Sequence, residues 1–318
     1  MRAIVRLPLF LLLSFGCARA ADQPETVTVG AVLNRIFDVS LHDNHFSVDL
    51  YVWFVWRDDK LNPHQTFQFM NGKLDERQEV TPRKKVNGLN YAAVRLVGTV
   101  SKYWDVAPFP LDDQTLNITI EDRQNDARKV RYAVDKENTQ INPRLRFPGW
   151  EIDRARSAAE VRDVESGTNY GDPEMPKGSA WRYPQFRYRI EIVRPGFRYY
   201  WKLFAGLFVA TLIAFLAFFI KVTNLDPRFG LGVGAIFAAV ASQYVTSSAE
   251  PDSQVLSLAD KVHITAFLFI FVSLLESTWS LYVFESGQEG RSRRMDRVAF
   301  LILFPAYVLA NWLVVYFR

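Results

Sequence analysis

One stretch of the chain, residues 226–251, combines a membrane-length run with side chains that lipid-facing helices avoid. Asp226, Pro227 and Arg228 precede an uncharged run that is rich in glycine, serine and threonine and poor in large aliphatic residues. Hydrocarbon offers no hydrogen-bonding partners for polar side chains, which at membrane depth usually face protein or water. The composition therefore indicates a shielded spanning helix, which could line a pore.

Helical spacing gathers part of this run on a single face. The predicted pore-lining stripe consists of Gly230, Gly234, Phe237, Ala241, Tyr244 and Ser248. Apolar rings can close a pore by dewetting, so Phe237 is the candidate gate and Tyr244 a second, outer ring. The alternative is that Gly230 and Gly234 form a small-residue packing face and that Phe237 faces a neighbouring helix.

Composition excludes several other functions. The chain has 318 residues, a net charge of +4 and a single cysteine, Cys17. No internal disulfide or cysteine-based metal site can form, and the spread-out basic residues do not indicate a nucleic-acid partner. The few histidines lack metal-ligand spacing, and there is no nucleophile elbow or phosphate loop. We therefore expect no enzyme activity, no cofactor and no metal.

The elements that must position the stripe fall into three parts. Residues 1–20 have the charged start, apolar core and small-residue cleavage site of a secretory signal. Residues 21–196 contain short alternating or apolar runs separated by turn signals, which predict an all-β sandwich of the immunoglobulin type. The clearest predicted strands are Val27–Leu33, Phe46–Trp56, Tyr91–Val100, Thr115–Glu121 and Phe186–Val193.

Residues 197–318 contain four runs of about the 20 residues that a spanning helix needs. The predicted spans are residues 199–220, 229–248, 262–284 and 298–317. Their two charged connections hold Lys221 and Arg228 in one case and Arg291, Arg293, Arg294 and Arg297 in the other. Such basic loops are typical of the cytoplasmic side, which places the first domain and the C-terminus outside.

Two polar residues lie within the later spans. Glu276 in the third and Asn311 in the fourth would form interhelical hydrogen bonds or, as the alternative, contribute to an ion path.

An outer β-sandwich followed directly by four spans, with a polar second span, resembles the pentameric ligand-gated ion channels. Local motifs support the resemblance: Trp56-Arg57-Asp58 with Leu61, the loop Phe109-Pro110-Leu111-Asp112-Asp113-Gln114, and Arg194-Pro195 followed by Tyr199-Tyr200. The family's loop cysteines would fall at Lys102 and Leu116, so the disulfide is absent. That absence and the short loop from Glu285 to Asp296 resemble the prokaryotic branch, which implies a bacterial inner membrane.

The resemblance implies a homopentamer in which the stripe surrounds a five-fold axis in the lipid bilayer. Asp226 and Arg228 would then bracket the cytoplasmic mouth. A ring of carboxylates would favour monovalent cations, and a ring of arginines would favour anions. Because Asp226 falls near an acidic position of cation-selective relatives, we expect cation selectivity. An anion channel of the same fold is the alternative.

The resemblance also implies an agonist site between neighbouring sandwiches, behind the hairpin Glu165–Gln185. The candidate ligand-binding residues are Tyr51, Tyr170, Trp181 and Tyr183. An aromatic cage of this kind suits an amine-like small molecule through cation–π attraction. Aromatic residues in a sandwich can equally belong to its core. Protons are the other candidate stimulus, with the many carboxylates and His263 as the titrating groups.

Transmission from sandwich to pore would run through the base of the sandwich. The candidate coupling residues are Asp112, Arg194, Glu250 and Pro251, and the resemblance implies an Asp112–Arg194 ion pair. Two functions of other classes remain open: a non-conducting periplasmic solute sensor and a membrane-anchored adhesin. The cytoplasmic loops are too short for an output domain, which counts against a sensor.

Overall fold

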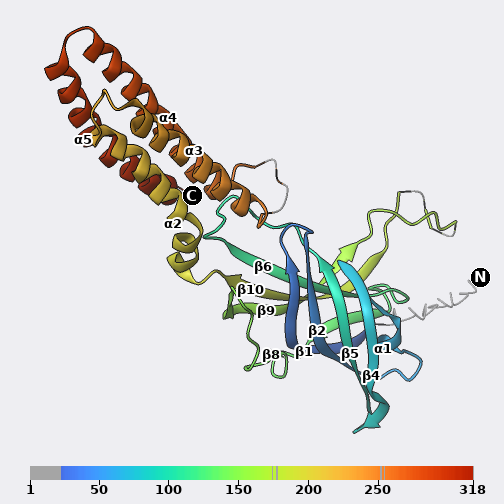
Figure 1. The fold of residues 1–318 in the computed structure, drawn as a ribbon. Coiled ribbons are helices and arrows are strands. Elements are labelled where there is room, and N and C mark those ends of the chain that lie inside the picture. The colour runs from blue at the N-terminus through green and yellow to red at the C-terminus, as the bar shows by residue number, and fades with distance from the viewer. Residues whose placement is uncertain (1–22, 174, 177, 251–252, 254, 318) are drawn as a thin grey trace, which may run out of the picture.

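The computed structural model describes residues 23–250, 253 and 255–317, except residues 174 and 177. It contains a β-sandwich followed by a bundle of long helices, with the bundle at one end of the sandwich (Figure 1). The predicted signal, residues 1–20, lies outside the described residues.

Two sheets form the sandwich. The larger has the strand order β4-β5-β2-β1-β7, with β8 paired to β1, and the smaller has the order β3-β6-β10-β9. The strands of the larger sheet are β1 (Glu25–Ser40), β2 (His45–Trp56), β4 (Gly72–Val86), β5 (Leu89–Ser101), β7 (Val130–Val134) and β8 (Gln140–Ile141). Those of the smaller sheet are β3 (Phe67–Phe69), β6 (Asp113–Asp122), β9 (Glu151–Glu165) and β10 (Arg182–Val193), and a short helix α1 (Pro63–Thr66) precedes β3.

Alternation of apolar residues explains the sandwich core. Val27, Val29 and Leu33 of β1 are fully buried, and they meet the buried residues of β6 and β10 in one cluster. Each such side chain contributes about 1.5–3 kcal/mol by leaving water. The prediction of an all-β sandwich is confirmed.

The sequence analysis did not predict two long strands, β4 and β9. Most residues of β4 and β9 are exposed or half-buried, so neither strand has the apolar alternation that marks a strand in sequence. The turn signals of the sequence include Asn87-Gly88, which joins β4 to β5 with φ values of 52° and 81°. Such angles suit a tight hairpin turn.

The bundle consists of α2 (Gly196–Phe215), continued by the 3₁₀ turn η1 (Leu216–Phe219), α3 (Leu225–Ser247), α4 (Leu258–Glu285) and α5 (Glu289–Tyr316). All four long helices are long and apolar enough to cross a membrane. Each begins earlier than the sequence indicated. The start of α4 is set by a capping box in which Ser257 and Asp260 exchange hydrogen bonds. The start of α5 includes the arginines of the preceding loop, since arginine favours helix.

Direct backbone bonds join the two parts. The amide of Leu258 donates to the carbonyl of Ala107 at 2.8 Å, and that of Ala259 donates to Phe109 at 3.1 Å. These bonds connect the start of α4 to the loop before β6, so that a displacement of one segment must displace the other.

Candidate functional site

The helix α3 presents its two faces to different surroundings. Arg228, Gly232, Ala235, Ala239 and Thr246 are buried against the rest of the bundle. Every residue of the predicted stripe is exposed on the single chain, with Phe237 at 71% and Tyr244 at 78%. The stripe therefore faces away from the chain's own helices and is free to line an axis.

The glycines of α3 divide between these faces. A methyl group added to Gly232 would collide with the side chain of Leu274 on α4, whereas one added to Gly230 or Gly234 would meet no other described atom within 4 Å. The glycine that packs against a neighbouring helix is thus Gly232. Within the described chain, Gly230 and Gly234 do not form the alternative packing face.

Arg228 is fully buried within the bundle. Its guanidinium donates to the two carboxylate oxygens of Asp296 at 3.1 and 2.6 Å and to the carbonyl of Ile220 at 3.1 Å, and it lies 3.6 Å from Glu276. Two distant carboxylates therefore draw Arg228 into the bundle, whereas the sequence analysis placed it beside Asp226 at a mouth; its role in selectivity stays a prediction. Asp226 remains exposed at the start of the helix.

The base of the sandwich holds the predicted Asp112–Arg194 pair. The Nε of Arg194 donates to Oδ1 of Asp112 at 2.5 Å, and the two side chains are only 8% and 1% exposed. The second carboxylate oxygen of Asp112 accepts from Gln114 at 2.9 Å. The guanidinium carbon of Arg194 lies 4.1 Å from the ring centre of Trp150. The pair is therefore fixed by charge, hydrogen bonds and ring stacking.

Glu250 lies in the link between α3 and α4, close enough to Asp112 for its charge to act on it. Burial, reinforced by the charges of Asp260 and Asp112, raises the pKa of Glu250 to about 7, although a hydrogen bond from Ser257 opposes the rise. Within the described chain its Oε1 atom is buried without a hydrogen-bond partner. Glu250 can therefore exchange a proton near neutral pH. Pro251 lies outside the described residues.

His263 is buried one turn into α4. One ring nitrogen lies 2.9 Å from the carbonyl of Ala259, and the other lies 3.4 Å from the hydroxyl of Ser242 on α3. The imidazole thus links two helices of the bundle, which is a structural position, and its role in proton response remains a prediction.

The aromatic residues of the expected agonist site are only partly brought together. Trp181 and Tyr183 have ring centres 6.5 Å apart at the start of β10. Burial, followed by the nearby hydroxyl of Tyr170, raises the pKa of Tyr183. Tyr170 is 69% exposed, and Tyr51 lies on β2 in the other sheet. The single chain therefore forms half of a cage at most.

A cation that the sequence did not suggest already occupies this half-cage. The guanidinium carbon of Arg128 lies 4.9 Å from the ring centre of Trp181. Arg128 is held there by Asp126, whose carboxylate accepts its Nη2 at 2.5 Å. The local sequence does not predict the contact, because Arg128 and Trp181 are distant in the chain and only folding brings them together. The face of Trp181 is suited to a cation, as the cage hypothesis requires.

The comparisons with known proteins bear on the whole chain. A proton-gated ion channel of Gloeobacter violaceus is 23% identical over 92% of this chain and 82% of its own length. The θ subunit of a mouse γ-aminobutyric acid receptor is 19% identical over 86% of this chain. A neuronal acetylcholine receptor subunit, α-9-II of Oncorhynchus mykiss, is 21% identical over 74% of it. The chain is a relative of the pentameric ligand-gated ion channels.

The share of each relative's length that this chain spans differs among the three. The chain spans 44% and 40% of the two receptor subunits but most of the bacterial channel. No protein-family profile matches the chain. The sandwich followed by four spans fits the fold of these channels.

Proposed function

We propose that the protein is a ligand-gated ion channel that assembles as a homopentamer and opens a cation-selective pore. The observation that carries the proposal is the exposed stripe of α3, where Phe237 and Tyr244 are bulky, apolar or aromatic, and unpartnered by the chain's own helices. Neighbouring copies around an axis would convert each exposed ring into a constriction.

The proposed setting is a bacterial inner membrane, with the sandwich and C-terminus periplasmic and both charged connections cytoplasmic. The support is the excess of arginine at the start of α5, which is typical of cytoplasmic loops. The bacterial relative described above is consistent with this setting.

Cation selectivity is supported by the contrast between two charges at the start of α3. Asp226 is exposed, whereas Arg228 is sequestered and paired with Asp296. A ring of exposed carboxylates concentrates cations at a mouth, and a guanidinium that is buried and paired adds little to the field in the pore. The anion-selective alternative loses its main candidate residue.

The proposed stimulus is a small amine-like ligand at Trp181 and Tyr183 or the proton. The amine is supported by the cation–π position that Arg128 occupies, since a ligand cation could replace it. The proton is supported by Glu250, which titrates near neutral pH beside the Asp112–Arg194 pair, and by the proton gating of the bacterial relative. Both stimuli would act through the junction between the sandwich and α4.

The test is the current through membranes that contain the Phe237→Ala variant, measured without agonist under a sodium chloride gradient. We expect a standing current that reverses toward the sodium potential, because the constriction is widened. The matched control is Phe271→Ala, which removes an equally bulky exposed ring from α4. It should leave the channel closed.

Other outcomes are equally informative. Reversal toward the chloride potential would retain the channel and refute cation selectivity. Absence of a standing current from protein shown at the surface would refute the gate assigned to Phe237. Absence of current from every variant under acid and under a panel of amines would favour the non-conducting sensor.

A further inference from the structure

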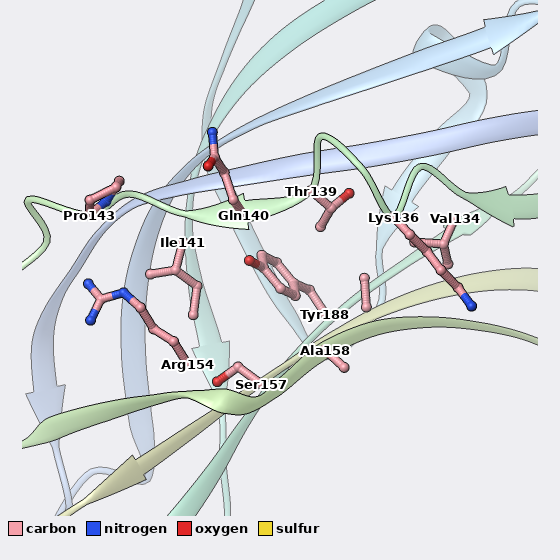
Figure 2. A pocket seen from close by; sticks show the side chains of 11 residues that line it. Val134, Lys136, Thr139, Gln140, Ile141, Pro143, Arg154, Ser157, Ala158 and Tyr188 are labelled. Carbon is pink, nitrogen blue, oxygen red and sulfur yellow. The ribbon is translucent and has the colours of Figure 1, made fainter.

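A cavity of about 680 Å³ opens between the two sheets of the sandwich, away from Trp181 and from α3. It lies where β7 and β8 of one sheet face β9 and β10 of the other (Figure 2). Tyr188 and Ile141 are buried and form the apolar floor, whereas Lys136 and Arg154 are exposed at the rim. In Figure 2 these two cations lie on opposite sides of Tyr188.

One wall of the cavity is a break in the edge of the larger sheet. Strand β1 pairs with β7 as far as Val134 and resumes pairing with β8 at Gln140. Between them the carboxylate of Asp135 accepts hydrogen bonds from Trp53 at 3.0 Å and from Asn138, while its amide donates to the carbonyl of Val29 on β1 at 2.9 Å. Side-chain bonds therefore fix the break.

At the break, the backbone of β1 that lacks a strand partner still makes a hydrogen bond. The hydroxyl of Thr139, which lines the cavity, accepts from the amide of Ala31 at 3.2 Å. A buried amide without a partner would be costly, so this bond stabilises the open edge.

The opposite wall is a bulge in β9. Ala158 is paired with Arg189 and Asp153 with Glu191, so residues 154–157 loop out opposite a single residue of β10. The hydroxyl of Ser157 donates to the carbonyl of Asp153 at 2.7 Å and accepts from the amide of Glu191 at 3.0 Å. Bulges held in this way re-aim side chains at functional sites. Here the bulge directs Arg154 to the rim.

The charge of the lining is one-sided. Lys136 and Arg154 are its ionisable cations, and no carboxylate is among its 11 residues. Among the ion pairs of the described residues none involves Lys136 or Arg154, and Arg154 donates to the carbonyl of Asn142 at 3.3 Å. The hydroxyl of Tyr188 faces the same space.

We propose that this cavity binds a small organic carboxylate. Arg154 or Lys136 would hold the carboxylate by charge-assisted hydrogen bonds, and the apolar body would rest on Ile141 and Tyr188. A cavity with an apolar floor, donors at the rim and no acid disfavours amines and favours anions. The site is thereby distinct in chemistry from the aromatic half-cage at Trp181.

The bulge offers a route from this cavity to the junction. Strand β9 begins at Glu151, directly after Trp150, whose ring stacks on Arg194. A carboxylate that rigidifies residues 154–157 would restrict Trp150 and therefore the Asp112–Arg194 pair. This consequence, modulation of the stimulus response, rests on the proposed channel function, whereas the binding itself does not.

The test uses benzoate as the probe and isothermal titration of the purified full-length protein, with benzamide as the neutral analogue. We expect saturable binding of benzoate that weakens at least tenfold, or about 1.4 kcal/mol, in the Arg154→Gln, Lys136→Gln double variant. The matched control is Arg144→Gln, which removes an exposed arginine that does not line the cavity. It should bind as the wild type does.

Three results would overturn the site: no saturable binding of benzoate, equal binding of benzamide, or undiminished affinity in the double variant. All variants change exposed side chains, so size-exclusion elution should match that of the wild type. Currents recorded with benzoate separate the two claims. Binding of benzoate to a protein that carries no current under acid or under the panel of amines would refute the proposed function and leave the carboxylate site intact.

Discussion

The buried ion pair at the base of α3 gives the sharpest prediction of stability. Arg228 is fully buried, and its contacts to Asp296 are 2.6 and 3.1 Å. Unit charges about 3 Å apart attract by roughly 5 kcal/mol at an effective dielectric constant of about 20. Removing one partner of a buried pair typically costs about 3–5 kcal/mol, because the other charge is left uncompensated.

The perturbation is Asp296→Asn. Glu276 stays 3.6 Å from the guanidinium and compensates part of the lost charge. We therefore expect the lower end of the range, about 3 kcal/mol, which corresponds to a melting temperature lower by about 6–12 °C. The assay is thermal unfolding of the detergent-purified protein at fixed pH and salt.

The helix α5, which carries Asp296, also supplies a matched control. Glu289 and Arg293 form an ion pair at 2.5 Å, but their side chains are 55% and 63% exposed. An exposed pair of this spacing contributes about 0.3–0.5 kcal/mol, so Glu289→Gln should shift the melting temperature by no more than about 2 °C. A rescue combines Arg228→Met, Asp296→Leu and Glu276→Leu, because apolar replacement of a whole buried ion cluster is often neutral, whereas Glu276 left alone would be an uncompensated carboxylate.

Equal shifts for Asp296→Asn and Glu289→Gln would refute the reasoning, since burial would then make no difference. A triple replacement less stable than Asp296→Asn would also refute it, because the uncompensated charge could not then be the cause.

Three further predictions concern other sites. Glu250→Gln should abolish the part of the current's pH dependence that has its midpoint at about 7, because the amide cannot titrate. Gly232→Ala should lower the melting temperature by overpacking against Leu274, at about 1–3 kcal/mol, whereas Gly234→Ala should raise it slightly through helix propensity. Asp112→Asn should move the midpoint of the stimulus–response curve, because it leaves a buried guanidinium without its carboxylate.

The sign of the Glu250 effect follows from its pKa. The value of about 7 lies above the ordinary 4.5, so the conformation described here binds the proton more tightly than a solvated carboxyl does. Its stabilisation by protonation is complete below about pH 4.5 and is lost as the pH rises through 7.

The control for the Glu250 prediction is Glu137→Gln, which changes an exposed carboxylate. An unchanged pH response in Glu250→Gln would contradict the prediction, as would lower stability in Gly234→Ala or an unmoved midpoint in Asp112→Asn.

Local patterns were sufficient to predict much of the fold. Apolar alternation located the buried strands, and run length located four spans, because both signals lie within about 20 neighbouring residues. The same rule failed for β4 and β9, whose exposed faces carry no alternation. The stripe was predicted to line a pore from helical spacing together with the family resemblance, and all its residues are exposed on the single chain.

The site features that were missed depend on contacts between distant segments. Arg228 was placed at a mouth from its position at the start of the second span and from the family resemblance, whereas its partners Glu276 and Asp296 lie on α4 and α5. The contact of Arg128 with Trp181 has the same origin. The carboxylate cavity needs two irregularities, one in each sheet, and neither break nor bulge has a sequence signal of its own.

The helix α5 explains why the Arg228 pair matters beyond stability. Its apolar side chains are largely exposed, and the described residues that it buries are Ser292, Asp296, Tyr307 and Asn311. In lipid, apolar contacts between helices give little driving force, so polar contacts and close packing must hold a helix in place. The ion pair of Asp296 therefore holds α5 in the bundle, as apolar burial holds a strand in the sandwich. Because its partner Arg228 is the first buried residue of the proposed pore helix, displacement of α5 must act directly on the base of that helix.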